Sequence, residues 1–316
     1  MRSLTLAAVL VLSFGACERP AGDRAEPNAE LPPAASTGNF EEHVYERNFV
    51  FTNVAGDSVF MVPWLMEART RPDGVRRRAR GWFARGGSWD EFYSARWNGP
   101  PTRAPWRILP HAGLRLVVGA SDAVEGIIFE EGPRKLELEL GDELIEWGGP
   151  RGEVFRVLDA ALYVSDQRVG GMALDMARAY ASGKGSPGDW AFLVSGDSLQ
   201  VVLENVEGAA PGSRGGYRGW ARLDFRDLQW PELTVDWTEV RAFEPARQDV
   251  PMSWTISTSG DAVSGVLESH TARIEAGQGK GPLLPVDALF EVSGTLRIAG
   301  VPYPVRGLLR HTRSSS

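Results

Sequence analysis

Alternation of hydrophobic and polar residues is the main pattern along this chain. Residues 136–140 read Leu-Glu-Leu-Glu-Leu, and residues 296–298 read Leu-Arg-Ile. A period of two places every second side chain on the same face of a β-strand. Such segments alternate with Gly-Asp, Gly-Gly and Pro-Asp-Gly turn signals at spacings of about 8 to 12 residues, which is typical of antiparallel β-proteins. The pattern predicts an all-β fold. The only stretches without helix breakers that could form a helix are residues 67–71 and 173–181.

The second half of the chain repeats segments of the first half at a nearly constant distance. Arg80-Gly81-Trp82 returns as Arg218-Gly219-Trp220, 138 residues later. Four further pairs occur in the same order, at offsets between 134 and 140 residues: 55–59 with 195–199, Trp97 with Trp237, 121–126 with 260–265, and 161–164 with 295–298. Repeats of roughly 20 to 50 residues indicate solenoids, whereas this repeat is as long as a domain. The sequence therefore predicts one duplication.

Each copy has the length and the turn spacing of a lipocalin-like β-barrel. About eight strands fit into such a unit, and a barrel of that size holds one small ligand or is filled by side chains. Closure into a barrel also removes exposed edge strands, which favour aggregation. We therefore expect two tandem antiparallel lipocalin-like β-barrels, the first at residues 44–180 and the second at residues 181–316.

The N-terminal residues have the pattern of an export signal that ends in a cysteine. Residues 1–17 begin with Met-Arg, continue with an apolar stretch over residues 4–14, and end in Gly-Ala-Cys17. The apolar stretch is too short to span a bilayer and has the length of a signal-peptide core. The small residues before Cys17 resemble the lipobox of bacterial lipoproteins. The resemblance implies a lipidated Cys17 that anchors the chain in the bacterial cell envelope, facing the periplasm; the alternative is an ordinary signal peptide with an incidental cysteine.

The composition narrows the remaining possibilities. Residues 18–43 are rich in Pro, Ala and Glu, and we expect them to form a disordered tether. The net charge of −7 argues against a nucleic-acid partner. Cys17 is the one cysteine of the chain, which excludes an intrachain disulfide and a cysteine-based metal site. The four histidines lack a local metal-ligand spacing, so we expect neither a metal nor a cofactor.

Strand parity places two ionisable residues on an apolar face of the second half. Along residues 262–274, Glu268 and His270 share one face with Val266 and Ile274. Inside a barrel they would form an acid–base pair, and burial would raise the pKa of Glu268, as a proton donor to an alkene or enol requires. Two other interpretations are a buried hydrogen-bonded pair and a β-bulge that turns both side chains outward.

Three further residues are candidates for lining a hydrophobic ligand pocket. His311 falls on the apolar face of the last predicted strand, together with Val305 and Leu309. Trp220 and Trp237 lie in predicted strands of the second half, and aromatic rings of this kind line many small-molecule pockets. The alternative is ordinary aromatic packing in a barrel core.

The C-terminal residues resemble a known family of tandem lipocalin-like proteins. Residues 290–294 read Phe-Glu-Val-Ser-Gly, and Gly300 and Gly307 follow them. This spacing is similar to the closing hairpin of the AttH/CrtC-like superfamily, and Trp220 and Trp237 fit the strands that precede it. The resemblance implies two barrels in tandem and an activity like that of the carotenoid 1,2-hydratases (hydroxyneurosporene synthases) and related cyclases.

These observations lead to one main functional hypothesis and two alternatives. The main hypothesis is a membrane-anchored lipocalin-like protein that binds a hydrophobic small molecule, such as an isoprenoid or a lipid. The first alternative is a hydratase or cyclase that acts on a polyene or isoprenoid through Glu268 and His270. The second alternative is a structural or assembly lipoprotein that uses its barrel surfaces for protein contacts.

Overall fold

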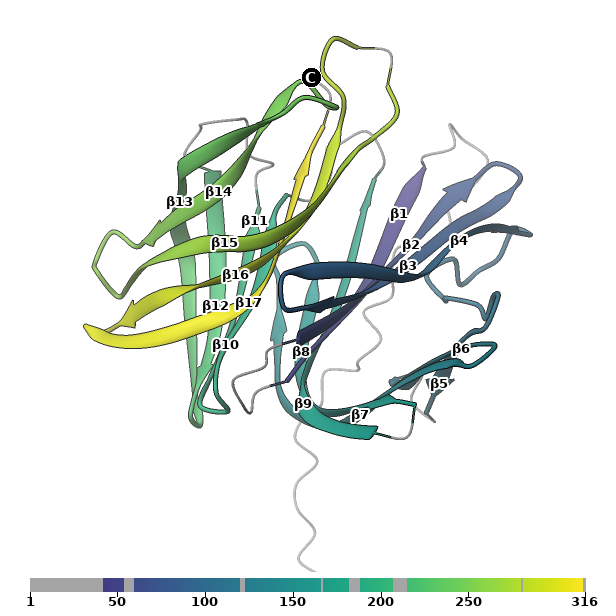
Figure 1. Ribbon diagram of the computed structural model, residues 1–316, viewed down its shortest axis with the longest axis horizontal. Coiled ribbons are helices and arrows are strands. Elements are labelled where there is room, and N and C mark those ends of the chain that lie inside the picture. The colour runs from purple at the N-terminus through teal and green to yellow at the C-terminus, as the bar shows by residue number, and fades with distance from the viewer. Residues whose placement is uncertain are drawn as a thin grey trace, which may run out of the picture. The chain divides into compact units, whose positions relative to one another are not determined.

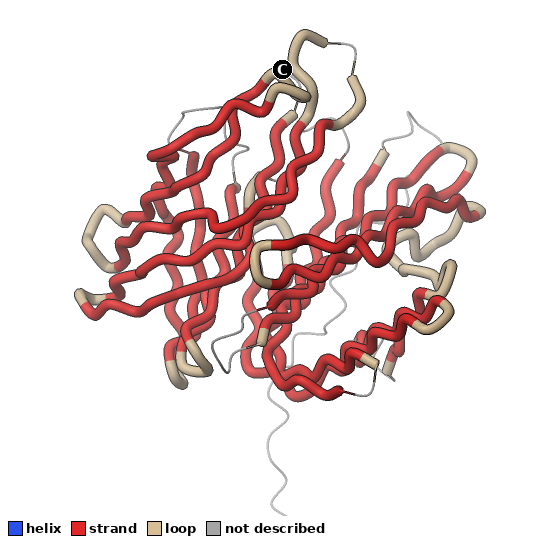
Figure 2. The backbone as a smooth tube through the Cα atoms, viewed as in Figure 1, coloured by secondary structure: helices blue, strands red, loops and turns tan. Residues whose placement is uncertain are grey.

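Regular structure in this protein consists of β-strands. The computed structural model describes residues 42–53, 60–119, 123–165, 167–181, 188–206, 215–279 and 281–314. Within these ranges every regular element is a strand and none is a helix (Figure 2). The two segments expected to be able to coil, residues 67–71 and 173–181, belong to strands. The predicted signal peptide, Cys17 and most of the predicted tether lie outside the described residues.

The first half of the chain forms one antiparallel sheet of nine strands (Figure 1). Its strands are β1 His43–Thr52, β2 Phe60–Arg71, β3 Gly74–Arg85, β4 Ser88–Gly99, β5 Leu114–Val118, β6 Val124–Glu131, β7 Arg134–Gly148, β8 Val154–Val164 and β9 Gln167–Ala181. Their order across the sheet is β4-β3-β2-β1-β9-β8-β7-β6-β5. Strand β9 returns to pair with β1, so the strands of this half form two consecutive meanders that meet at that pair.

The second half forms a closed antiparallel barrel of eight strands. Its strands are β10 Trp190–Ser195, β11 Leu199–Asn205, β12 Gly215–Leu223, β13 Arg226–Phe243, β14 Gln248–Ser257, β15 Val263–Ala276, β16 Val286–Ile298 and β17 Val301–Arg313. Each strand pairs with the next one in sequence, and β17 closes the barrel against β10.

The all-β, lipocalin-like fold class is confirmed, and the two halves differ in closure. The first sheet curls into a half-barrel, and no backbone pairing joins its edge strands β4 and β5 among the described residues. Side chains bridge this opening instead: the rings of Phe92 and Phe129 lie 5.2 Å apart, and the Tyr93 hydroxyl donates to the His111 carbonyl at 2.7 Å. Apolar packing between the edges thus takes the place of the missing strand pairing.

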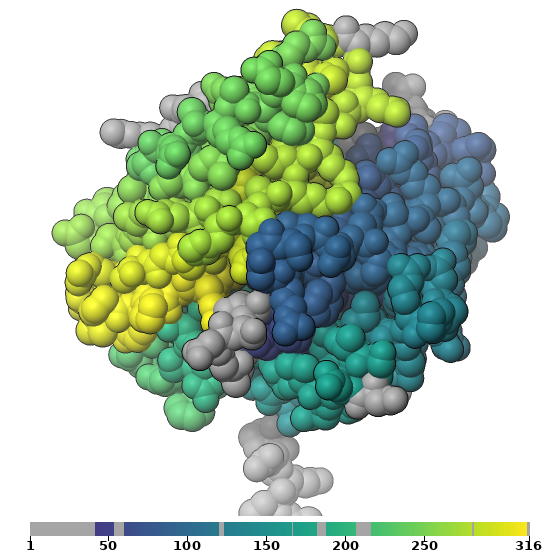
Figure 3. Space-filling model, viewed as in Figure 1, coloured from purple at the N-terminus to yellow at the C-terminus, as the bar shows by residue number. Residues whose placement is uncertain are grey.

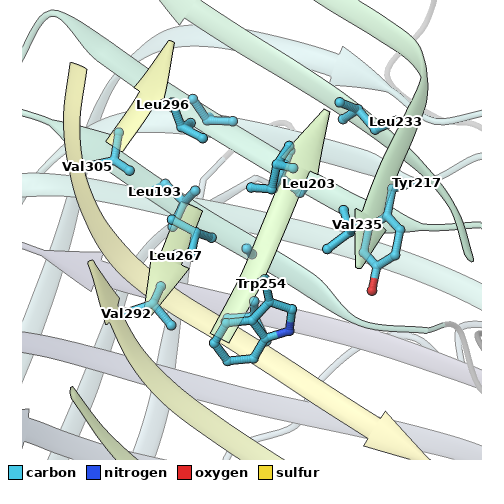
Figure 4. Close-up of a cluster of buried hydrophobic side chains, with 14 of the residues drawn as sticks. Leu193, Leu203, Tyr217, Leu233, Val235, Trp254, Leu267, Val292, Leu296 and Val305 are labelled. Carbon is cyan, nitrogen blue, oxygen red and sulfur yellow. The ribbon is translucent and has the colours of Figure 1, made fainter. Parts of the chain in front are cut away.

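Buried side chains gather in three places, which follow from the alternation along the strands. One cluster fills the barrel, with Leu193, Trp254 and Leu267 at its centre (Figure 4). A second cluster fills the curled first sheet and includes Phe49 and Trp64. The third cluster contains residues of both halves and lies between the two sheets. Because this third cluster is apolar and buried, the two sheets form one compact unit.

The repeated Arg-Gly-Trp segment occupies corresponding places in the two halves. Gly81 lies in the third strand of the first sheet and Gly219 in the third strand of the barrel. A Cβ at Gly81 would meet the ring of Trp64 on the preceding strand, and a Cβ at Gly219 would meet Leu203 at the same relative position. Both following tryptophans belong to the cluster between the sheets. The first copies of two other repeated segments, 55–59 and part of 121–126, lie outside the described residues.

Charged side chains form a second set of contacts between the two sheets. Acidic and arginine side chains alternate along a chain of ion pairs: Glu91, Arg273, Glu275, Arg80, Asp287, Arg310, Glu46, Arg178, Glu204, Arg151 and Glu153. Most of these pairs join a residue of the first sheet to one of the barrel, and the surfaces of the two halves meet along this seam (Figure 3). Each charge in this series of ion pairs has an opposite partner, which offsets part of the penalty for removing it from water.

Candidate functional site

A polar cluster lies at one end of the barrel interior, beside apolar residues of the barrel core such as Leu309. Nδ1 of His311 lies 2.9 Å from both carboxylate oxygens of Asp189. The hydroxyl of Tyr217 donates to Oδ2 of Asp189 at 3.2 Å. All three residues are buried. Buried ionisable groups that hold one another in a fixed arrangement are typical of binding and catalytic sites.

The strand register brings these three residues together. On β17 the side chains of Val305 and Leu309 point into the barrel core, and His311 continues the same face at the end of the strand. Asp189 comes immediately before β10, the strand that pairs with β17. The Asp189 carboxylate also accepts a hydrogen bond from the backbone N–H of Thr312, at 3.1 Å. Main-chain contacts therefore hold the carboxylate in place beside the imidazole.

The electrostatics of the cluster assign a role to each group. Burial, reinforced by the charge of Asp189, raises the pKa of Tyr217 well above its ordinary value, so its hydroxyl keeps its proton and donates it. When Nδ1–H of a neutral His311 ring donates to this carboxylate, Nε2 is the acceptor nitrogen of the ring. Nε2 is buried and has no hydrogen-bond partner among the described residues. In this state Nε2 can accept a hydrogen bond from a ligand inside the barrel.

The indole ring of Trp237 packs against the imidazole ring of His311. Trp237 meets His311 edge to face, with 5.1 Å between ring centroids and an interplanar angle of 87°. Trp237 is half-buried and packs against the apolar cluster that fills the barrel. An apolar ligand body would lie on such a surface, while one polar group of the ligand reached the imidazole.

The structure brings together some of the residues predicted from the sequence. His311 and Trp237, both expected to line a pocket, are in direct contact inside the barrel. Trp220 lies elsewhere: its ring packs 4.9 Å from Phe155 of the first sheet, in the cluster between the two sheets. Trp220 therefore contributes to packing between the halves and has no access to the barrel interior.

The expected position of Glu268 and His270 inside the barrel is wrong. Both side chains are exposed on the outer face of β15, whereas Val263 and Leu267 point into the core. Up to Ser269 the strand presents the opposite face to the one that parity over 262–274 suggested. A β-bulge between Ser269 and Thr271 then returns Ala272 and Ile274 to the core side. The His270 ring hydrogen-bonds with Ser293 on the outside. This arrangement is the outward-turned alternative.

Sequence reasoning missed Asp189 and Tyr217. Asp189 precedes Trp190 in a Gly-Asp-Trp segment, where an aspartate at the start of a strand also suits an ordinary turn. Tyr217 follows two glycines and has no distinctive neighbours in the sequence. One signal for these partners was available in the sequence: His311 alternates with the apolar residues of its strand. A histidine on an apolar face needs a polar partner when it is buried.

Two searches for other kinds of site gave negative results over the described ranges. No group of three or more His, Cys, Asp or Glu side chains is arranged to hold a metal ion there. In the same part of the chain, no helix is long and apolar enough to cross a membrane.

Comparison with known proteins shows a similarity of fold. No protein-family model matches the sequence, and no curated protein matches it either. Among solved structures, a putative AttH from Nitrosomonas europaea superposes with a TM-score of 0.59 at 10% identity, over 89% of this chain and 99% of that one. Kievitone hydratase from Nectria haematococca superposes with a TM-score of 0.54 at 11% identity, over 86% and 89% of the two chains. CghA superposes with a TM-score of 0.51 at 14% identity, over 93% and 97%.

The fold of this chain is therefore similar to the lipocalin-like fold of these AttH-like structures. The resemblance that the C-terminal residues suggested is thereby confirmed at the level of the fold. At sequence identities of 10% to 14%, the similarity supports a shared fold and nothing further.

Proposed function

We propose that this protein binds a hydrophobic small molecule at the end of the barrel where His311 lies. The observation that carries the proposal is Nε2 of His311, a buried acceptor without a partner among the described residues. A buried polar atom without a partner costs free energy, on the order of 1 to 3 kcal/mol. A ligand that donates a hydrogen bond to Nε2 would recover this energy.

The surroundings of His311 restrict the chemistry of the ligand. The centre of the barrel is filled by side chains such as Leu193 and Trp254, so the ligand occupies only the end of the barrel (Figure 4). Trp237 offers an apolar ring beside the acceptor. The best fit is a molecule with an apolar body and one hydrogen-bond donor, such as a hydroxylated isoprenoid or lipid.

A second candidate function is an acid–base reaction on the same ligand. A carboxylate that fixes Nδ1–H of a histidine makes Nε2 a general base and stabilises the imidazolium that forms. Asp189 and His311 have this arrangement, and one structural neighbour is named a hydratase. In a hydration, Nε2 would take a proton from water as the oxygen adds to carbon, and would then return that proton to the adjacent carbon. Asp189, His311 and Tyr217 would replace Glu268 and His270 as the reactive groups.

We further propose that Cys17 is lipidated and anchors the protein in the cell envelope, facing the periplasm. The support is the sequence alone: an apolar stretch of signal-peptide length followed by Gly-Ala-Cys17. Labelling of the expressed protein with a clickable palmitate analogue tests it. Label on the natural protein and none on a Cys17→Ser variant is the expected result, and an unlabelled natural protein would refute the anchor.

Binding can be tested with N-phenyl-1-naphthylamine, an apolar fluorophore with one N–H donor. We expect saturable binding, weakened about 5- to 100-fold in His311→Phe, as loss of a buried hydrogen bond predicts. His270→Phe is the matched control, because His270 is exposed on the outer face. Equal affinity in both variants would exclude His311 from the site. Absence of binding in every form would favour a structural or assembly role.

A further inference from the structure

A hollow of about 730 Å³ lies on the outer face of the first sheet, over the neighbouring strands β7, β8 and β9. Its lining residues are Glu139, Gly141, Asp159, Ala160, Ala161, Arg168, Val169, Gly170 and Gly171. Ligand pockets for small molecules commonly measure about 300 to 1,000 Å³. The hollow belongs to the half of the chain that does not contain His311, so it is separate from the site proposed above.

Small residues form the floor of the hollow. Ala161 pairs with Glu139 of β7 on one side and with Gly170 of β9 on the other. A Cβ placed on Gly170 would meet no atom within 4 Å, so this glycine faces open space. Glycine inside a strand often marks a place where a ligand approaches the backbone closely. The accessible part of the floor is therefore Gly170, which is exposed, whereas Ala161 beside it is buried.

Charges of both signs stand around this floor. Asp159 and Glu139 are exposed carboxylates, and Arg168 is an exposed guanidinium. Glu139 accepts a hydrogen bond from the Tyr163 hydroxyl at 3.1 Å, which fixes its side chain. Over the described ranges, neither Asp159 nor Arg168 takes part in an ion pair, although they line the same hollow. Both charges are thus available to a ligand.

The strand register separates Arg168 from Asp159. Arg168 pairs with Tyr163, two residues along β8 from Ala161, while Asp159 lies two residues from Ala161 in the opposite direction. Side chains two residues apart on a strand lie on the same face, so a ligand stretched over Ala161 has a positive group at one end and a negative group at the other.

We propose that this hollow binds a small zwitterionic molecule, with its ammonium group at Asp159 and its acidic group at Arg168. The apolar segment between the two charged groups lies over Gly170, the exposed residue of the floor. Since the charges are exposed to solvent, each ion pair contributes modestly, and the affinity depends on both ends being engaged at once.

The test uses 6-aminohexanoate as the probe, with hexylamine and hexanoate as single-charge controls. Saturation-transfer NMR titrations of the whole protein measure the three affinities. The zwitterion is expected to bind most tightly, and Arg168→Gln is expected to weaken it about two- to fivefold without affecting hexylamine. Equal affinities for the three probes, or no saturable binding of 6-aminohexanoate, would overturn the proposal.

A variant that fills the hollow provides an independent control. Gly170→Leu places a side chain in the open space and is expected to abolish binding of the probe. Gly148→Leu is the matched control, because a Cβ on this other strand glycine also meets no atom within 4 Å but lies outside the hollow. Unchanged binding in Gly170→Leu, with both variants folded by circular dichroism, would place the probe elsewhere and refute the site.

Discussion

Arg178 of the first sheet and Glu204 of the barrel form an ion pair across the seam between the two halves, with 3.4 Å between Nη1 and Oε1. Both side chains are almost completely buried. Arg178 also holds Glu46 at 2.6 Å, so a single guanidinium joins β1 of the first sheet to β11 of the barrel. The contact between the sheets is therefore specified by charge as well as by apolar packing.

Glu204 is expected to make stability depend on pH. Burial outweighs the attraction of Arg178 and Arg151 and raises the pKa of Glu204 to about 7. The folded state therefore binds this proton more tightly than the unfolded state does, and the resulting stabilisation is complete below pH 4.5 and is lost as the pH rises towards 7. Relative to Glu204→Gln, the natural protein should lose unfolding free energy between pH 5 and pH 8. Urea unfolding at these pH values measures it; a constant difference would show that Glu204 does not titrate in this range.

Asp287 is expected to show the opposite dependence. The guanidinium groups of Arg310 and Arg80 hold the pKa of Asp287 far below its ordinary value. The stabilisation is therefore present above the unfolded pKa and is lost as the pH falls. Asp287→Asn should destabilise the protein by about 2 kcal/mol at pH 7 and by less at pH 3.5. Glu91→Gln, at the more exposed end of the same chain of ion pairs, should cost under about 1 kcal/mol, and equal losses in the two variants would contradict this ranking.

The duplicated Arg-Gly-Trp segment predicts parallel effects in the two halves. A Cβ at Gly81 would lie 2.6 Å from the Phe92 ring, and a Cβ at Gly219 would lie 2.6 Å from Leu233. Alanine at either position should lower the unfolding free energy by about 1 to 3 kcal/mol, as overpacking does. Gly148→Ala, with no atom near its Cβ, should have little effect. Chemical denaturation measures all three variants, and a harmless Gly81→Ala would break the equivalence of the halves.

Parts of the fold followed from the sequence because they depend on local pattern. Alternating residues such as Leu136 and Leu138 fixed the strand type, and the duplication placed Gly81 and Gly219 on corresponding strands. Closure did not follow, because it depends on whether two distant edge strands meet. In the first half no strand pairing joins the edges β4 and β5, and side chains such as Phe92 on β4 and Phe129 on β6 make contact across the opening.

The candidate site was predicted only in part, also for a physical reason. Among the histidines, His311 lies on the strand face that the alternation of its neighbours predicted, and its side chain is inside the barrel. In β15 the same reasoning assigned Glu268 and His270 to the wrong face, because alternation there is weak and a bulge interrupts the register. Asp189 reaches His311 only because β10 closes against β17, a contact between residues 122 positions apart. Pairing over such a distance has no local signal.

Native mass spectrometry of the protein purified from the cells that produce it naturally tests the central claim most directly, because it detects any small molecule that stays bound at His311. The account predicts an adduct that organic solvent releases as an apolar compound with a hydrogen-bond donor. The adduct should disappear in His311→Phe and persist in His270→Phe. An adduct of unchanged abundance in His311→Phe, or a natural protein that carries none and binds no apolar donor, would contradict it.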